Sequence, residues 1–379
     1  KLGKPVSFFM EDEETARRRL ERNLEIDSVE ALLSRPTAAQ ALEKAEALLA
    51  AATSSAEICR LHLIVGTALN LLVRGPEALT ELTAAERLQS ATRLETRRRI
   101  KYQIAVAFRH SGNSPRAIQL LRQLLDELET STATDQLLRL RVLKDLGVIL
   151  IDSGSYEEAN SYLLTALEWA NDIGDLSALV SIYNGLGYAH RALGDLDAAV
   201  GYVQRALAMN EAVQDLTSAA TMHNFLAVIA GDRGHFDAAM RHVDRAINLA
   251  RASGPAYNLP HFICTKAECE LKQGNVAAAQ LHADEALAAA VETGNKRAAA
   301  AAKLVLSDVH RSYGDVTLGE RQLKEAADIY RGLGASAELG DTYMRLSKLA
   351  TESGDSRGAQ RYANSAYRAT KRTSALLER

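Results

Sequence analysis

Two asparagines are the residues of this chain whose type and spacing most suggest molecular recognition. Asn184 and Asn224 lie 40 residues apart and hold the same place in consecutive repeats of the sequence. An asparagine side chain offers one acceptor oxygen and two donor hydrogens, so a neighbouring pair can hydrogen-bond to both sides of an extended peptide backbone. The alternative is a structural role, in which the two amides bond neighbouring helices.

Motifs of catalytic centres are missing from the sequence. There is no G-x-x-x-x-G-K-[ST] phosphate loop, no H-E-x-x-H zinc helix and no G-x-S-x-G nucleophile elbow. The segment Gly185-Leu186-Gly187 lies within an expected helix, where its glycines favour close helix packing over phosphate binding. Carboxylates are scattered, as on any solvated helical surface. We therefore expect no enzymatic activity and no cofactor.

The cysteine and histidine spacings do not favour a metal site. Cys264 and Cys269 are five residues apart, which places them about 140° apart around a helix, on different faces. His235 and His242 are seven residues apart and can share a face, but no third ligand accompanies them. We interpret these two as surface histidines and expect no bound metal.

The composition favours helix and gives the chain no strong attraction to nucleic acid or lipid. Ala, Leu, Glu and Arg dominate, and the net charge is −3. No apolar run reaches the ~18–20 residues that span a membrane, and no signal peptide is visible. The sparse cysteines, Cys59, Cys264 and Cys269, indicate a reducing environment. We expect a cytoplasmic location and no membrane contact.

Recurring glycines divide the chain into repeats. The first series is Gly112, Gly154, Gly194, Gly234, Gly274, Gly314 and Gly354, with steps of 40 residues after a first step of 42; Gly75 lies 37 residues before it. The second series is Gly174, Gly254, Gly294 and Gly334, with Gln214 replacing glycine once. Glycine suits a helix C-terminus because it accepts positive φ. Two such marks in each period predict two helices per repeat.

Small residues recur at fixed distances from the first glycine series. Seven residues before each glycine stand Ala105, Gly147, Gly187, Ala227, Ala267, Ser307 and Ser347. Five after it stand Ala117, Ala159, Ala199, Ala239, Ala279, Gly319 and Ala359, and twelve after it stand Leu124, Ala166, Ala206, Ala246, Ala286, Ala326 and Ala366. Small side chains at these places let the helices of a pair approach closely and receive the next pair.

This layout resembles the tetratricopeptide repeat (TPR) family, over about residues 55–371. The resemblance implies an all-α fold, a right-handed superhelical solenoid of about nine helix pairs. The period of 40 residues exceeds the usual ~34, so each helix is expected to be nearly a turn longer. Lys266 and Glu270 stand where the family has apolar residues, and prolines flank this repeat, so its first helix is expected to start late, near Leu259.

Within this scheme the chain has four parts. We expect residues 12–54 to hold a linker helix and the first helix pair, as 12–33 with 36–52. Residues 55–371 form the repeat domain, whose first pair is 55–74 with 76–90. The tail, residues 372–379, is expected to fray. Residues 1–11 are considered separately below.

The resemblance also predicts which residues face a groove. In the TPR family the first helix of each pair lines the concave side, at places about ten, six and three residues before the turn glycine. We expect peptide contacts at these places from Tyr102, Arg109, Lys144, Asn184, Tyr188, Arg191 and Asn224, and from Arg141 one turn earlier. Arg99 adds to the basic side of this groove, whereas Glu268 and Asp308 make its later part acidic. Ordinary solvated cations are the alternative interpretation of the basic residues.

The first eleven residues suggest a second family. The order of Leu2-Gly3-Lys4-Pro5-Val6-Ser7-Phe8-Phe9-Met10-Glu11 resembles the end of Cro/lambda-repressor-type helix-turn-helix domains, which often read LGVPVSFFF before an acidic linker. The resemblance implies that residues 1–11 are the remnant of an N-terminal DNA-binding domain. The alternative is an apolar cap over the first repeat.

Together the two resemblances point to the RRNPP group of bacterial regulators. Membership implies that the repeats bind a short signalling peptide, that the protein is a homodimer, and that it touches DNA only through the missing N-terminal domain. The alternative is a TPR scaffold that holds a partner protein without any role at DNA. A third possibility, a TPR arm of a signalling ATPase or a phosphatase-like antagonist of response regulators, has no positive support in the sequence.

Overall fold

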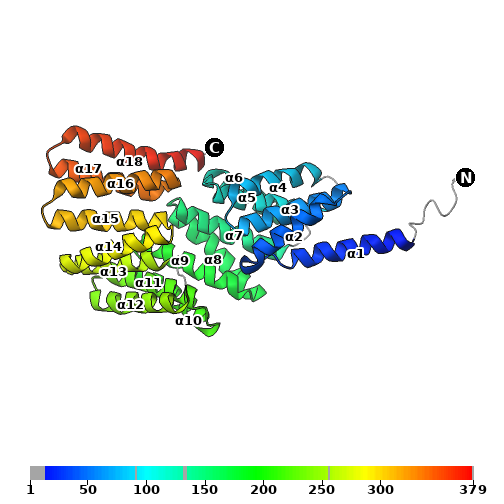
Figure 1. Cartoon of the computed structure of the whole chain (residues 1–379), viewed down its shortest axis with the longest axis horizontal. Helices are drawn as coiled ribbons and strands as arrows, with labels where there is room; N and C mark the ends of the chain where they lie inside the picture. Colours follow the sequence, from blue (N-terminus) through cyan, green and yellow to red (C-terminus); the bar gives the residue numbers. More distant parts are fainter. Residues whose placement is uncertain (1–12, 90–91, 131–134, 255–256, 378–379) are drawn as a thin grey trace, which may run out of the picture. The chain divides into compact units, whose positions relative to one another are not determined.

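A computed structural model describes residues 13–89, 92–130, 135–254 and 257–377, and the regular structure in these ranges is entirely helical. The helices follow one another as nine antiparallel pairs, coloured in chain order in Figure 1. The predicted all-α TPR fold is therefore confirmed. The helix-turn-helix interpretation of residues 1–11 lies outside the described residues.

The chain divides into two compact units, residues 1–138 and 139–379. The first unit contains α1 (Glu13–Glu30), the short 3-10 helix η2 (Arg35–Thr37), α2 (Ala38–Ala50), α3 (Ser55–Leu71), α4 (Gly75–Leu88), α5 (Leu94–His110) and α6 (Ser114–Glu129). The division falls within the step of 42 residues that interrupts the 40-residue period.

The second unit repeats the same helix pair six times. It contains α7 (Gln136–Asp152, entered from the first unit), α8 (Tyr156–Ile173), α9 (Leu176–Ala192), α10 (Leu196–Ala212), α11 (Leu216–Asp232), α12 (Phe236–Ala252), α13 (Leu259–Lys272), α14 (Val276–Glu292), α15 (Lys296–Ser312), α16 (Val316–Leu333), α17 (Ser336–Glu352) and α18 (Ser356–Leu377). Most of these helices have 17 residues, which is about 26 Å of helix.

The turns between helices show why the glycines recur. At Gly194 the backbone is left-handed, with φ of 84°, and the next amide, that of Asp195, donates to the carbonyl of His190 at 2.9 Å. The Asp195 carboxylate then accepts from the Ala198 amide at 3.0 Å and so caps α10. One turn thus ends a helix and starts the next within about four residues.

Small residues bring the helices of a pair close together. A Cβ atom on Gly187 of α9 would lie 2.6 Å from Val203 Cγ2 of α10, a separation that packed carbons do not tolerate. On α10, Ala199 and Ala206 are fully buried. The small positions predicted around each glycine are therefore packing positions, and Gly185-Leu186-Gly187 lies inside a helix as expected.

The repeat around Gly274 departs from the others as the sequence predicts. Its first helix, α13, begins at Leu259 and has only 14 residues. Lys266 donates to Asp244 of α12 at 2.8 Å, and buried Glu270 accepts from His282 of α14 at 2.7 Å. The two polar residues at apolar places are therefore satisfied by neighbouring helices.

The C-terminal tail differs from expectation. The last helix, α18, continues to Leu377, whereas fraying was expected from residue 372. Helical backbone bonding continues because the sequence after Ala366 contains neither proline nor glycine to end it.

Candidate functional site

A hollow of about 280 Å³ lies along the odd-numbered helices of the second unit. We call it the groove hollow. Helices α9, α11, α13, α15 and α17 all contribute to its lining, through Arg191, Val228, Gly231, Asp232, Thr265, Glu268, Cys269, Leu271, Lys272, Val305, Asp308 and Arg345. Half of these residues stand six or three residues before a turn glycine, so the predicted stripe does face this hollow.

Ion pairs across neighbouring helices organise the charges of the groove hollow. Asp232 accepts from Arg191 Nε at 2.6 Å, and its other oxygen lies 3.8 Å from Lys272 Nζ. Asp308 accepts from Arg345 at 3.0 Å. These pairs join α9 to α11, α11 to α13 and α15 to α17. The predicted basic residue Arg191 therefore already has a carboxylate partner.

Glu268 differs from the other carboxylates of the groove hollow. Among the described residues it has no ion pair, and its side chain is exposed to the hollow. Burial among the surrounding helices raises the pKa of its carboxyl, although Lys272, Arg345 and Arg191 act in the opposite direction. A cationic or hydrogen-bond-donating group entering the hollow would stabilise the ionised Glu268.

The place ten residues before the glycine is less open than expected. Tyr102, Asn224 and Cys264 hold this place in three repeats and expose only 8%, 5% and 1% of their surface. The cause is visible at Asn224, because its neighbour Phe225 packs beneath the ring of Tyr188 from the preceding odd helix. This place faces a contact between helices more than it faces solvent.

Both predicted asparagines nevertheless lack hydrogen-bond partners. The Oδ1 atoms of Asn184 on α9 and Asn224 on α11 are buried and accept no hydrogen bond. Leaving a buried amide oxygen unsatisfied costs about 1–3 kcal/mol. The structural alternative, in which these amides bond neighbouring helices, is therefore not what the structure places here.

Tyr188 links the two asparagine-bearing helices. Its ring stacks on Phe225 with centroids 3.9 Å apart and planes 21° apart, while 40% of the residue stays exposed. Desolvation raises the pKa of its phenol, so the hydroxyl stays protonated at neutral pH. Tyr188 can thus offer an apolar ring face and a hydrogen-bonding group to a ligand.

The remaining predicted cations have different surroundings. On α7, Arg141 is exposed, and the Lys144 ammonium lies 3.2 Å from the neighbouring Asp145 carboxylate. Arg109 lies on α5 of the first unit, half-buried, as does the buried Tyr102. Within the second unit, Arg141 and Lys144 are thus the basic residues of the set with the least direct ion pairing between helices.

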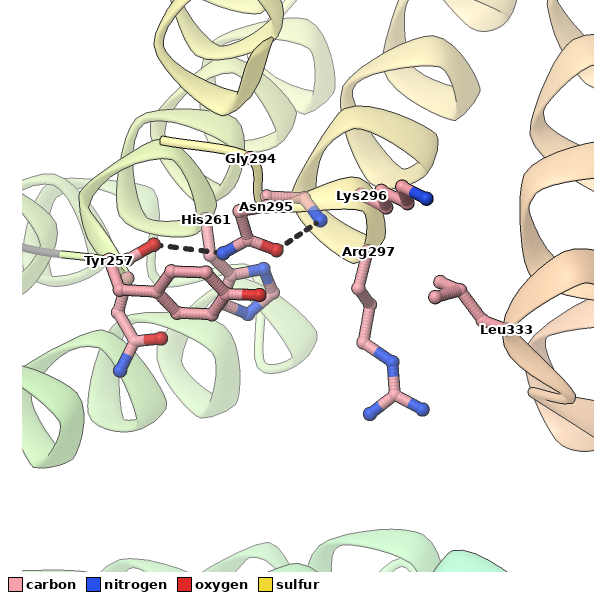
Figure 2. A pocket seen from close by; sticks show the side chains of 9 residues that line it. Tyr257, His261, Gly294, Asn295, Lys296, Arg297 and Leu333 are labelled. Atoms are coloured by element: carbon pink, nitrogen blue, oxygen red, sulfur yellow. Dashed lines mark hydrogen bonds between the residues drawn. The ribbon is translucent and has the colours of Figure 1, made fainter. Parts of the chain in front are cut away.

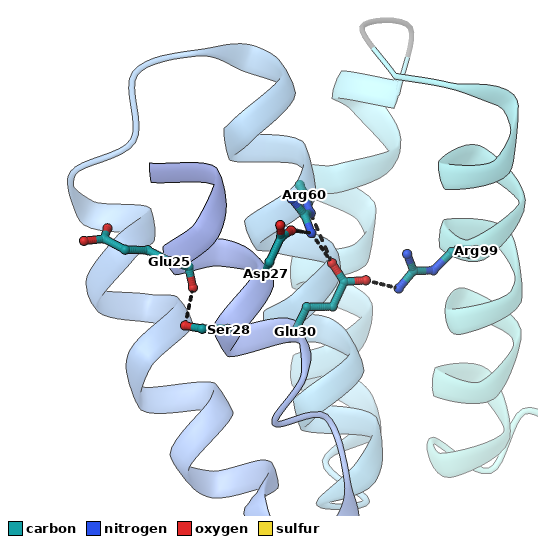
Figure 3. Close-up of polar contacts among 6 residues, drawn as sticks. All are labelled: Glu25, Asp27, Ser28, Glu30, Arg60 and Arg99. Carbon is teal, nitrogen blue, oxygen red and sulfur yellow. Dashed lines mark hydrogen bonds and ion pairs between the residues drawn. The ribbon is translucent and has the colours of Figure 1, made fainter. Parts of the chain in front are cut away.

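Arg99, the other basic residue expected in a groove, belongs to an ion-pair cluster in the first unit (Figure 3). The Glu30 carboxylate accepts from Arg99 at 2.5 Å and from Arg60 at 2.6 Å, and Arg60 also donates to Asp27. Burial acts to raise the pKa of Glu30, but the two arginine hydrogen bonds outweigh it and lower the pKa. The Arg99 charge is therefore used to join α1 to α5.

A histidine pair was not expected from the sequence. His242 of α12 lies with its Nδ1 atom 3.1 Å from Nδ1 of His223 on α11, whereas His235 is exposed, as interpreted. The spacing of 19 residues between the paired histidines follows no helical periodicity, because it crosses a turn. Among the described residues, no three His, Cys, Asp or Glu side chains form a group able to hold a metal ion.

Acid is expected to destabilise the second unit through this pair. Burial lowers the pKa of His223 and of His242, helped by their mutual proximity and by Arg241 and Arg245, while Glu211 opposes the effect at His223. The folded chain then binds fewer protons than the unfolded chain as the pH falls through about 6.5. The free energy of unfolding must therefore decrease in this range.

Urea unfolding at a series of pH values measures this effect. Replacing both paired histidines with glutamine should flatten the pH dependence between about pH 7.5 and 5.5. The matched control is His235→Gln, which removes an exposed histidine and should keep the wild-type slope. An unchanged slope in the double variant would contradict the prediction.

A second hollow, of about 510 Å³, lies where α13 and α15 begin (Figure 2). Asn295 joins its walls: its Nδ2 donates to the Tyr257 carbonyl at 2.8 Å, and its Oδ1 accepts from the Ala298 amide at 3.0 Å. Arg297, which projects into it, pairs with Glu338 at 3.1 Å. This Asn295 hollow thus has its amide fully engaged in holding the late start of α13.

Antiparallel helix pairs with a hollow along their first helices define a tetratricopeptide-repeat protein. Two family models described as tetratricopeptide repeat match the chain, at residues 178–252 and 141–173. No curated protein matches its sequence. Within the described ranges, no helix is both long and apolar enough to cross a membrane.

Solved structures with a similar fold include regulators. A Rap protein complexed with competence and sporulation factor has a TM-score of 0.73 at 13% identity, over 94% of this chain and 99% of that one. The apo form of the quorum sensor NprR from B. thuringiensis has a TM-score of 0.65 at 14% identity, over 92% and 98%. Aspartyl phosphate phosphatase F from Bacillus subtilis has a TM-score of 0.60 at 12% identity, over 92% and 93%. At these identities the likeness establishes the fold.

Proposed function

We propose that this chain is the sensor part of a bacterial regulator and binds a short linear peptide along its odd-numbered helices. The observation that carries the proposal is the pair of unsatisfied amide oxygens, on Asn184 and Asn224, beside the groove hollow. An extended peptide has unpaired backbone N–H groups that such oxygens can accept from once the amides turn toward it. The likeness to a Rap protein complexed with a signalling factor supports the same class of ligand.

The charges of the second unit give the peptide a direction in this proposal. Its negative group, a carboxylate terminus or an acidic side chain, lies toward Lys144, Arg141 or Arg191. Its positive group lies toward Glu268, the carboxylate without an ion pair. Tyr188 packs against an apolar side chain between them. In the first unit, Tyr102 and Arg109 are secondary candidates.

We propose that the regulator acts as a cytoplasmic homodimer and touches DNA only through a helix-turn-helix domain, of which residues 1–11 resemble the end. A two-fold operator needs two recognition helices, and this chain by itself should bind duplex DNA weakly and without sequence preference. Sequence-specific binding by the 379 residues alone would contradict this assignment. A TPR scaffold without a role at DNA remains the alternative, and the phosphatase named above is a third class with the same fold.

Selection from a displayed library of random heptapeptides tests the central proposal. Immobilised chain should enrich a family of short peptides that bind, as synthetic peptides, with a dissociation constant of about 1 μM or less. Peptide capture should not require any helical conformation in the free peptide. Failure to enrich any peptide, together with capture of folded partner proteins only, would replace the sensor with the scaffold.

A further inference from the structure

We propose that a third hollow of the second unit is a docking site for an apolar residue of a partner polypeptide together with the peptide group of that residue. This hollow, the Asn210 hollow, measures about 490 Å³ and lies between the start of α9, the end of α10 and the start of α11. Its lining includes Leu176, Val180, Met209, Asn210, Val213 and Asp215. The inference is independent of the peptide groove.

Comparison with the other repeats singles out Asn210. It stands four residues before the second glycine place, where Ala170, Ala250, Ala290 and Tyr330 stand in the other repeats, all of them buried. Asn210 exposes only 3% of its surface, and its Nδ2 is buried with no hydrogen-bond partner. A buried, unpaired amide destabilises the chain relative to the alanine that its own repeats use. Packing alone therefore gives no reason for asparagine at this place.

The Asn295 hollow, at the corresponding ends of later helices, shows what a structural asparagine looks like. There both ends of the amide are bonded, to Tyr257 and Ala298. In the Asn210 hollow no such partners exist. The next turn residue, Gln214, also departs from its repeats, since it adopts a left-handed φ of 57° where four other repeats have glycine. Two departures therefore fall on one turn, beside one hollow.

The lining selects a neutral, apolar occupant. Leu176 and Val213 expose 58% and 64% of their surface at its rim. The one charged group, Asp215, is engaged in capping α11, because its two oxygens accept from the amide and the hydroxyl of Ser218 at 2.9 and 2.7 Å. An ionic ligand would find no free counter-charge. A peptide group offers both a carbonyl and an N–H, which is the complement of a side-chain amide.

This hollow is separate from the peptide groove. Leu176 begins α9, whereas Arg191 of the groove hollow lies in the last turn of the same helix. The intervening 15 residues correspond to about 22 Å. Occupation of one hollow can therefore be observed without occupation of the other.

Methionine methyl NMR tests the proposal on the intact chain. The chain has five methionines, of which Met209 lines this hollow and Met344 lies exposed on α17. We expect N-acetyl-leucyl-leucinamide, used as the probe, to shift the Met209 methyl signal saturably and to leave the Met344 signal in place. Asn210→Ala should weaken this binding about 5- to 150-fold while raising the melting temperature of the free chain.

Two further variants keep the test decisive. Val213→Ser changes an exposed rim residue without disturbing the core and should also weaken the probe. Asn160→Ala is the matched control, because Asn160 on α8 also carries a buried, unpaired amide oxygen but does not line the hollow. It should leave the affinity unchanged. No Met209 shift at the solubility limit of the probe, or equal binding by wild type, Asn210→Ala and Val213→Ser, would overturn the proposal without affecting the peptide groove.

Discussion

Replacing Gly187 with valine is expected to destabilise the second unit by about 2–3 kcal/mol. The new Cβ would lie 2.6 Å from Val203 Cγ2 and 3.2 Å from Phe225 Cε1, and both neighbours are buried. Relief requires α9 to move away from α10, which would also disturb the Tyr188–Phe225 stacking. Urea unfolding followed by the fluorescence of Trp169, the single tryptophan, reports on this unit.

A second helical glycine provides the matched control. Gly201 lies in the middle of α10, and a Cβ built on it would meet no atom within 4 Å. Gly201→Ala should therefore stabilise the unit by about 0.5–1 kcal/mol, since glycine is a poorer helix former than alanine. Opposite signs for the two glycines would show that contact with the partner helix, and not glycine itself, decides the outcome. Wild-type stability of Gly187→Val would refute the packing role of the small positions.

The fold was predictable because a repeat records its own geometry several times. Seven glycines in register and small residues on either side specify two helices and the contact between them, whatever the remaining positions hold. Even the late start of α13 at Leu259 follows from the local prolines. The division between residues 138 and 139 was not predicted, because a two-residue change of period does not reveal whether neighbouring repeats stay in contact.

The candidate site was predictable only in part. Places six and three residues before the glycine line the groove hollow as expected, because helical periodicity determines which way a side chain points. The same periodicity does not reveal what covers that side chain, so the burial of Asn224 was missed. Ion pairing was missed for a related reason: Arg191 and Asp232 are 41 residues apart and meet only when successive repeats stack.

The unpaired Asn210 marks the limit of reading one sequence. Its departure from alanine is visible along the repeats, but only the structure shows that its amide lacks a partner. The histidine pair is similar, since its two members come from adjacent helices at unrelated phases. Features that depend on the absence of a neighbour need coordinates, whereas features that repeat do not.

Removing both groove amides is expected to abolish peptide binding. Asn184→Ala and Asn224→Ala should each weaken a peptide selected from the heptapeptide library by about 5- to 150-fold, which corresponds to ~1–3 kcal/mol of lost or unpaired hydrogen bonds. The double variant should show no measurable heat in calorimetry. Helicity should remain near wild type, and stability should not fall, because the amide oxygens that are removed have no partners in the free chain.

Asn160→Ala separates recognition from general packing. Asn160 shares the buried, unpaired oxygen of the groove asparagines but lies on the even-numbered helix α8. If its replacement leaves peptide affinity intact while the groove variants lose it, the effect belongs to the odd-numbered helices. Normal binding by the double groove variant, or loss of its helicity, would show that these amides are structural. The location of the asparagines in successive odd helices makes the two outcomes distinguishable, since a structural amide that is removed alters melting before it alters affinity.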